Sequence, residues 1–238
     1  MAQLAQANAT NRFLRALPPA VFRRVESSLQ PVALRHGTVI GYIGAPLTEL
    51  YFLDRGLISL VKVMNDGRTA EIAVVGNEGI VAITALMGMS QADSIEMTVQ
   101  IDASGHRLAL RALEAEMVRS KELHALATRY LQFTMNRLAQ TAACNVLHRL
   151  RQRCCRWLLV AHDNAGAPSF GLTHEFLAMM MGVHRPALSV VLESLQRRRL
   201  IETQRGAITI LDRPGLEASV CECYAAVRRD LENVYELA

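Results

Sequence analysis

Ten arginines lie between Arg149 and Arg213, a stretch that contains five acidic residues and no lysine. Arginine stays charged at all physiological pH values, and its planar guanidinium donates paired hydrogen bonds to a phosphate or to the edge of a base. Residues 1–119 carry 11 basic and 11 acidic groups, whereas residues 120–238 carry 15 and 11 and account for the whole net charge of +4. A polyanion such as DNA is therefore expected to bind to the C-terminal half.

The five cysteines form a second group of reactive side chains, and none lies before Cys144. An odd, clustered set of this kind favours free thiols over disulfides. Cys144 and His148 are spaced to share one face of a helix, but a single residue separates Cys221 from Cys223. Zinc sites prefer about two to four intervening residues. We therefore predict no metal and no cofactor, and a redox role of Cys221 and Cys223 is left as a hypothesis.

Other reactive chemistry finds little support in the sequence. A nucleophile elbow, a phosphate loop, an HExxH motif and paired carboxylates are all absent, which argues against an enzyme. An iron–sulfur cluster held by N-terminal cysteines is excluded, because no cysteine lies in that half. Cys154 and Cys155 are adjacent on a predicted helix and point to different faces. Haem remains open as an alternative, and its candidate axial ligands are His36, His106, Met64, Met87 and Met89.

The most informative stretch runs from Leu172 to Leu211. Thr173 is placed to cap a helix, Gly182 supplies a tight turn, and Pro186 fits the first turn of a second helix. Two short strands at residues 200–203 and 207–211 follow, joined through a glycine. Helix, tight turn, helix and hairpin together predict a winged helix-turn-helix.

The second of these helices is narrow enough to enter a major groove with its N-terminal residues against base edges. Arg185 can reach guanine O6 and N7, a contact worth about 1–3 kcal/mol of discrimination. Residues 197–199 and Arg205 lie where phosphates would pass. The alternative is a pair of packed helices with a solvated, arginine-rich face. The predicted DNA-binding residues are Thr173, His184, Arg185, Pro186, Ser189, Arg197, Arg198 and Arg205.

Two further segments must position this motif. Residues 31–113 alternate short apolar runs with glycine-containing turns, which predicts a β-sandwich or jelly roll behind two short helices. Residues 114–163 contain neither glycine nor proline, and an apolar stripe there repeats at alternating spacings of three and four. The stripe predicts a helix that pairs in a dimer, and packing on the chain's own sheet is the alternative. The predicted dimer residues are Thr128, Leu131, Met135, Leu138 and Ala142.

The chain is thus predicted to be an α+β protein in three parts. These are a β jelly-roll domain at residues 1–113, a dimerisation helix at 114–143, and a winged helix-turn-helix domain at 144–238. No run of about 18 apolar residues is present, so we predict no membrane span. The N-terminus lacks the features of a secretory signal, and the expected location is the cytoplasm.

This order of parts, with the motifs GVHRPALSVVLESLQ and LIETQRGAITIL, resembles the Crp/Fnr family of bacterial transcription regulators over nearly the whole chain. The resemblance implies a homodimer joined by its long helices, a (pseudo)palindromic site on double-stranded DNA, and contact with RNA polymerase if the protein is an activator. It also matches Arg185 to the family's base-reading arginine. Pro186 stands where many members have a base-reading glutamate, so the family's well-known half-site is not expected.

Members of the family that bind cyclic nucleotides hold the phosphate with a Gly-Glu-Leu-like turn and a later Arg-Ser or Arg-Thr pair. Here an apolar or neutral residue between Val81 and Thr84 falls near the glutamate, and Asp93–Glu96 falls near the arginine pair. No lysine or arginine lies between Arg68 and Arg107. A buried phosphate needs a cationic partner, so we predict that cyclic AMP and cyclic GMP are not effectors. The alternative function is a small-molecule-binding regulatory module whose winged helix contacts proteins.

Overall fold

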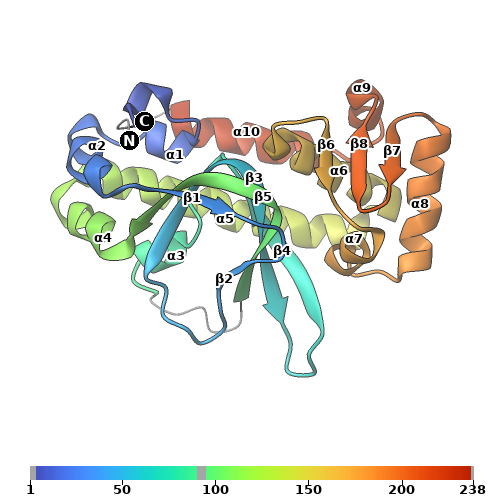
Figure 1. Cartoon of the computed structure of the whole chain (residues 1–238), viewed down its shortest axis with the longest axis horizontal. Helices are drawn as coiled ribbons and strands as arrows, with labels where there is room; N and C mark the ends of the chain where they lie inside the picture. The colour runs from blue at the N-terminus through green and yellow to red at the C-terminus, as the bar shows by residue number, and fades with distance from the viewer. Residues whose placement is uncertain (1–3, 90–94, 237–238) are drawn as a thin grey trace.

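The computed structural model describes residues 4–89 and 95–236. Figure 1 shows the N-terminal half as a sheet with covering helices, long helices running along the molecule, and a mainly helical C-terminal part at the far end. Two short helices, α1 (Arg12–Arg15) and α2 (Pro19–Val25), flank Pro18 as predicted. They are accompanied by the 3₁₀ turns η1 (Gln6–Asn8) and η2 (Glu26–Ser28).

The N-terminal strands form one antiparallel sheet in the order β1-β5-β3-β4, with β2 also paired to β5. β3 and β4 form a hairpin, whose turn contains Gly67 at a φ of 83°. The predicted N-terminal β-domain is therefore confirmed, as an antiparallel sheet. A short helix, α3 (Ile83–Leu86), follows β4. The strands are β1 (Gln30–Leu34), β2 (Val39–Gly41), β3 (Glu49–Val63), β4 (Thr69–Val75) and β5 (Ile95–Ala109).

The stretch without glycine and proline is three helices: α4 (Leu110–Arg119), α5 (Lys121–Leu147) and α6 (Leu150–Ala165). Ser120 separates the first two, because its Oγ accepts a hydrogen bond from the Leu123 amide at 3.1 Å and caps α5. The long helix therefore begins at Lys121 rather than at residue 114, and it continues beyond the expected end at residue 143.

The C-terminal part contains two helices joined by a tight turn, followed by a small sheet in the order β6-β8-β7. β7 and β8 are the predicted wing, and β6 adds a third strand. The aliphatic core beneath them includes Leu158, Leu177 and Leu188, all fully buried. The elements are β6 (Ser169–Gly171), α7 (His174–Met181), α8 (Arg185–Arg197), β7 (Ile201–Gln204), β8 (Ala207–Ile210), α9 (Arg213–Glu217) and α10 (Cys223–Glu236).

The last helix, α10, turns back and runs along α5 toward the N-terminal half (Figure 1). Its Glu232 forms an ion pair with Arg12 at 2.7 Å, and the Tyr235 hydroxyl donates a hydrogen bond to the Glu78 carbonyl at 2.5 Å. Val234 is buried in the N-terminal core. Residues 144–238 were predicted as one domain, but α10 packs largely with the other half. Nothing in its local pattern indicates this long-range contact.

One property of α7 and α8 concerns membranes. Among residues 4–89 and 95–236, no single helix is long and apolar enough to cross a bilayer, although α7 and α8, bent by 111° at their junction, would pass on length and composition if taken together. In this fold Leu177 of α7 and Leu188 of α8, like most of the apolar residues of both helices, pack in the C-terminal core, whereas Met179 and Val190 are exposed.

Candidate nucleic-acid interface

The tight turn between α7 and α8 is built by local contacts. The Thr173 Oγ1 accepts a hydrogen bond from the Phe176 amide at 3.2 Å and caps α7, as its residue type predicts. Gly182 ends α7 in the left-handed region at a φ of 63°, where a side chain would be strained. Pro186 occupies the first turn of α8, where its missing N–H leaves no helical bond unmade. The turn therefore holds the start of α8 in one orientation.

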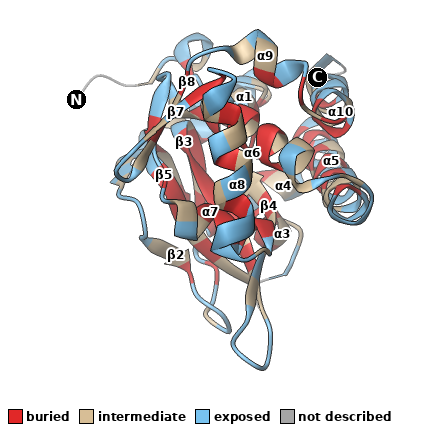
Figure 2. Ribbon diagram, turned by 90° about the vertical axis from the view of Figure 1, so that its right-hand side faces the viewer, coloured by how far each residue is buried: buried red, intermediate tan, exposed pale blue. Residues whose placement is uncertain are grey.

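The two faces of α8 differ sharply in exposure. Leu188, Leu192 and Leu195 are fully buried and fix the helix to the core. The opposite face is open to solvent, and Figure 2 shows this outer surface of α8 in the colour of exposed residues. Of the predicted base-contacting residues on it, His184, Arg185 and Pro186 are exposed and Ser189 is partly exposed.

The arginines around α8 are free to contact a ligand. Arg197 and Arg198 lie at the end of α8, and Arg205 lies at the tip of the wing next to Gly206. The side chains of Arg185, Arg197, Arg198, Arg199 and Arg205 are exposed, and within the described parts of the chain none makes a hydrogen bond or an ion pair that would hold it back. Exposed guanidinium groups thus lie at the N-terminus of α8, at its end and on the wing.

Other arginines of the basic stretch have structural roles instead. Arg153 donates from Nη2 to the Met181 carbonyl at 2.6 Å and so satisfies the end of α7. Arg213 forms ion pairs with Asp163 at 2.7 Å and Glu217 at 2.9 Å. The count of basic residues in the sequence therefore overstates the charge available to a polyanion, because these two guanidinium groups hold the fold together.

The predicted dimer stripe lies on the outer face of α5. Thr128, Met135 and Ala142 are exposed, with 64% of Met135 accessible, and Leu131 and Leu138 are partly buried. A different stripe, which includes Leu126, Tyr130 and Phe133, packs on the N-terminal core. Leu131 therefore packs against the N-terminal core, whereas Thr128, Met135 and Ala142 are exposed, and pairing of this stripe in a dimer stays a prediction. An apolar face along α5 is left uncovered within the single chain.

The segment expected to correspond to a nucleotide-phosphate turn is apolar. Ala82 adopts the left-handed region at a φ of 67° and precedes α3. Val81 and Ile83 are buried in the N-terminal core. Glu96 accepts a hydrogen bond from the Thr98 hydroxyl at 3.0 Å, whereas Asp93 lies outside the described residues. The turn and helix are therefore present, but hydrophobic side chains occupy the positions nearest the expected glutamate.

The two histidines considered as haem ligands are engaged within the protein. His36 Nδ1 lies 2.9 Å from the Gln100 carbonyl, and its ring packs edge-on against Phe176 of α7. His106 Nδ1 lies 3.7 Å from an Asp54 carboxylate oxygen. The contacts of His36 account for its ring as a structural group and join the β-domain to the helix-turn-helix. His106 Nδ1 is buried and makes no hydrogen bond within the described parts of the chain.

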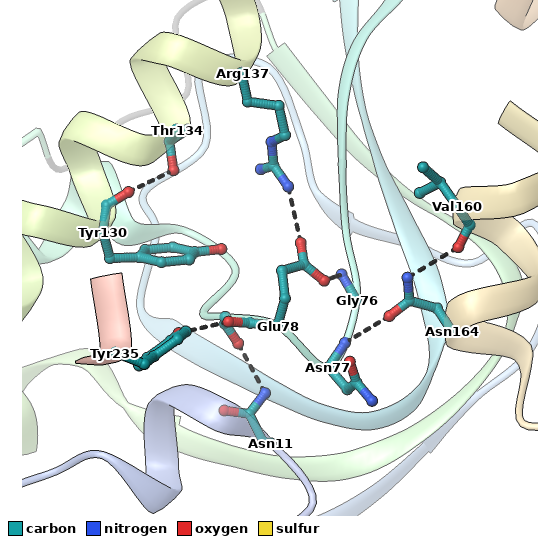
Figure 3. A network of polar contacts seen from close by, with 11 residues as sticks. Asn11, Gly76, Asn77, Glu78, Tyr130, Thr134, Arg137, Val160, Asn164 and Tyr235 are labelled. Carbon is teal, nitrogen blue, oxygen red and sulfur yellow. Dashed lines mark hydrogen bonds and ion pairs between the residues drawn. The ribbon is translucent and has the colours of Figure 1, made fainter. Parts of the chain in front are cut away.

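A polar network missed by the sequence analysis joins the halves at the turn Gly76–Gly79 (Figure 3). Glu78 forms an ion pair with Arg137 of α5 at 2.8 Å and accepts a hydrogen bond from the Gly76 amide at 2.8 Å. The Asn77 amide donates to Asn164 of α6 at 2.9 Å. The Asn11 side chain donates to the Gly79 carbonyl at 2.8 Å. One turn of the β-domain is thereby tied to α1, α5, α6 and α10.

A cavity of about 250 Å³ borders this network, between β4, α5, α6 and α10. Its polar lining mixes charges of both signs. Arg137 Nε and Nη2 and Arg156 Nε are buried there without a hydrogen-bond partner within the described parts of the chain. On the β4 side, Glu71 accepts hydrogen bonds from Ser59 and, at 2.8 Å, from Trp157 Nε1. Desolvation raises the pKa of Glu71 to about 7.

The cysteines fall into two groups. Cys154 and Cys155 are buried separately in the C-terminal core, where burial raises the pKa of both thiols. The remaining three, Cys144, Cys221 and Cys223, meet His148 with all four candidate ligand atoms within 4.8 Å of one another. The prediction of no metal site considered the spacing of each pair alone, whereas the fold brings the two pairs together.

Known proteins similar to this chain are transcription regulators. Residues 152–219 match the Crp-like helix-turn-helix domain. The global nitrogen regulators of Synechocystis sp. and Synechococcus elongatus are each 24% identical to the chain, over 80% and 81% of it and 90% and 91% of their own lengths.

Solved structures resemble most of the chain. A transcriptional regulator of the CRP family from Thermus thermophilus is 25% identical over 79% of this chain and 95% of its own, with a TM-score of 0.64. FixK2 from Bradyrhizobium japonicum shares 15% identity over 81% of this chain and 98% of its own, with a TM-score of 0.65. The chain thus carries a Crp-like helix-turn-helix domain within a Crp/Fnr-like fold. The predicted fold class and the predicted class of protein, a DNA-binding transcription regulator rather than an enzyme, are confirmed.

Proposed function

We propose that the protein acts as a homodimer that recognises a specific sequence in double-stranded DNA through α8. The observation that carries the proposal is the exposed, unpaired side chain of Arg185 at the N-terminus of α8, a helix held in place by three buried leucines. A guanidinium at this position can donate to guanine O6 and N7 in the major groove. Arg197, Arg198 and Arg205 then bind phosphates, and Thr173, His184, Pro186 and Ser189 complete the contact surface.

The dimer forms through the uncovered face of α5. Thr128, Leu131, Met135, Leu138 and Ala142 follow the alternating spacing of a helix pair, and two copies of this face bury each other's apolar atoms. A twofold dimer presents two α8 helices to two half-sites, so the target is a (pseudo)palindrome. The protein works in the cytoplasm, and RNA polymerase is a partner where the bound site lies beside a promoter that the protein activates.

Cyclic AMP and cyclic GMP do not control this function. Val81 and Ile83 are buried where a polar cradle for a phosphate is required, and the sequence between Arg68 and Arg107 carries no cation. A phosphate buried there without a positive partner would be strongly disfavoured. Calorimetric titration of either nucleotide into the protein should give no saturable heat, and micromolar binding would contradict this part of the proposal.

The experiment that tests DNA recognition compares the wild type with Arg185→Ala. Genomic fragments bound by the wild type are selected, and affinities are measured for the selected site and for random duplex. We expect Arg185→Ala to reduce the preference for the selected site by about 1–3 kcal/mol while binding to random duplex is retained. Equal losses on both duplexes would place Arg185 outside the groove. A wild-type protein that ignores duplex DNA at low salt would instead favour protein contacts by the winged helix.

A second candidate function, control by a small acidic molecule, is favoured by three buried guanidinium nitrogens in the cavity between the halves. Within the described parts of the chain, Nε and Nη2 of Arg137 and Nε of Arg156 have no hydrogen-bond partner. Such donors gain a partner when a carboxylate or phosphate enters. Succinate and inorganic phosphate are suitable probes for titration into the wild type and Arg156→Gln. Saturable heat that the substitution abolishes supports this function, whereas the absence of heat with both probes, or equal heat in both proteins, contradicts it.

A further inference from the structure

Four side chains with metal-binding atoms meet where the end of α5 contacts the start of α10. Cys144 lies in the last turn of α5, and His148 is the residue directly after that helix. Cys221 precedes α10, and Cys223 is its first residue. The three sulfurs and one imidazole nitrogen all lie within 4.8 Å of one another, and the three cysteines are buried. The pair Cys144 and His148 and the pair Cys221 and Cys223, which are far apart in the sequence, thus form one cluster.

The spacing of these atoms fits a tetrahedron of zinc ligands. The Cys144 and Cys221 sulfurs are 3.7 Å apart, and the Cys223 sulfur is 3.5 Å from His148 Nδ1. With Zn–S bonds of about 2.3 Å and Zn–N bonds of about 2.0 Å, the edges of a tetrahedron measure about 3.8 Å between sulfurs and about 3.5 Å between sulfur and nitrogen. Two of the six edges therefore already have the lengths that one central ion requires, and the other four are no longer than 4.8 Å.

Neighbouring groups form hydrogen bonds to these ligands and orient them, as the partners of metal ligands commonly do. His148 turns Nδ1 toward the cysteines, while its Nε2 lies 3.2 Å from a Glu222 carboxylate oxygen. A carboxylate at Nε2 holds the ring in the tautomer whose Nδ1 lone pair is free to bind a metal. The Gln140 amide donates to the Cys223 sulfur at 3.0 Å. This hydrogen bond stabilises negative charge on that sulfur.

We propose that Cys144, His148, Cys221 and Cys223 bind one Zn²⁺ ion in a closed, tetrahedral structural site. Three sulfurs and one imidazole are a donor set that zinc favours, whereas magnesium and calcium require oxygen ligands. Binding releases the thiol protons and leaves three thiolates around the ion, with a net charge of −1 for the cluster. Arg153 and Arg156 of α6 interact electrostatically with Cys144 and offset this charge.

The proposed site connects two parts of the chain that lie far apart in the sequence. Cys144 and Cys221 are 77 residues apart, and the whole helix-turn-helix lies between them in the sequence. A zinc ion therefore joins the residues that follow the helix-turn-helix, Cys221 and Cys223, to the end of α5, the helix that carries the predicted dimer face. If the chain binds DNA as proposed, the site also sets the orientation of α8 relative to α5, but the presence of the site does not depend on that function.

Metal analysis of the full-length, reduced protein tests the proposal directly. We expect about one zinc ion per chain after purification from zinc-containing medium. Cys221→Ser should lose most of this zinc, whereas Cys155→Ala, which removes a buried thiol outside the cluster, should retain it. Cobalt(II) in place of zinc should give the intense visible absorption of a tetrahedral thiolate site in the wild type and in Cys155→Ala, but not in Cys221→Ser.

A substitution at an exposed residue tests the site even if the cysteine variants fail to fold. The Glu222 side chain is 75% exposed, so Glu222→Ala should fold normally yet weaken zinc binding about 10- to 100-fold by releasing the histidine ring. Unchanged zinc affinity in Glu222→Ala would overturn the proposed orientation of His148. Wild-type protein that binds neither zinc nor cobalt, or that carries a Cys144–Cys221 disulfide when isolated without oxidant, would overturn the site itself. These readouts involve no DNA and are independent of the proposed function.

Discussion

Arg137 of α5 and Glu78 of the β-domain form an ion pair with 2.8 Å between Nη1 and Oε1, and only 8% and 12% of the two side chains is exposed (Figure 3). A second pair, Arg12 and Glu232, has similar geometry at 2.7 Å but leaves 23% and 52% exposed. Both pairs join distant parts of the chain. Their different burial makes them a matched test of what an ion pair contributes to this fold.

Glu78→Gln should destabilise the protein strongly. The substitution leaves the Arg137 charge buried without a counter-charge, a change that typically costs about 3–5 kcal/mol. Glu232→Gln should cost less than about 1 kcal/mol, because water solvates the Arg12 side chain that remains. Urea unfolding of both variants measures the two values. Similar losses in the two would show that burial does not separate these pairs.

Glu71 should make the stability of the protein fall as the pH rises through neutrality. Desolvation raises the pKa of this carboxyl to about 7 in the folded protein, above its unfolded value. The folded state therefore binds the proton more tightly than the unfolded state does. The stabilisation that results is fully present below the unfolded pKa and is lost as the pH rises through about 7. Glu71→Gln keeps groups that can bond to Ser59 and Trp157 but does not titrate.

Unfolding free energies at about pH 5 and about pH 8 measure this effect. Relative to Glu71→Gln, the wild type should lose about 1–3 kcal/mol between the two conditions. Glu114→Gln removes an exposed carboxylate and serves as the control, with a pH dependence like that of the wild type. A Glu71→Gln variant that follows the wild-type pH curve would contradict the prediction.

Met135→Glu should convert the proposed dimer into a monomer. The side chain lies in the uncovered stripe of α5, and in a parallel pair two glutamates would face each other in an apolar interface. Sedimentation velocity measures the change in mass, and circular dichroism should show an unchanged helix content. Asn136→Glu adds the same charge one residue further along, on an exposed position away from the stripe, and should remain dimeric. Equal behaviour of the two variants would place the interface elsewhere.

Arg205→Ala should weaken binding to all DNA sequences alike. The wing tip carries this exposed guanidinium, and a phosphate contact contributes affinity without sequence information. The slope of log affinity against log salt should fall by about 1 per chain. Arg68→Ala, on the exposed hairpin tip of the β-domain, should leave both affinity and slope unchanged. A change in the preferred sequence with Arg205→Ala would show that this residue contacts bases.

Short-range patterns were sufficient to predict the helix-turn-helix and its wing. The Thr173 cap, the Gly182 turn and the Pro186 start act within one or two turns of helix, so their residue types are readable wherever they occur. The same holds for the periodic stripe of α5. A cap could have corrected the start of that helix too, because Ser120 stands three residues before the buried Leu123 and marks the boundary.

Contacts between distant residues required the folded chain. Arg137 and Glu78 are 59 residues apart, and Tyr235 and Glu78 are 157 residues apart, so no local period relates them. The packing of α5 against the β-domain decides the first contact. The return of α10 along α5 decides the second, and it also brings Cys221 and Cys223 to Cys144 and His148. Local propensity acts over a few residues, whereas ligand sets and buried ion pairs depend on how whole elements pack against one another.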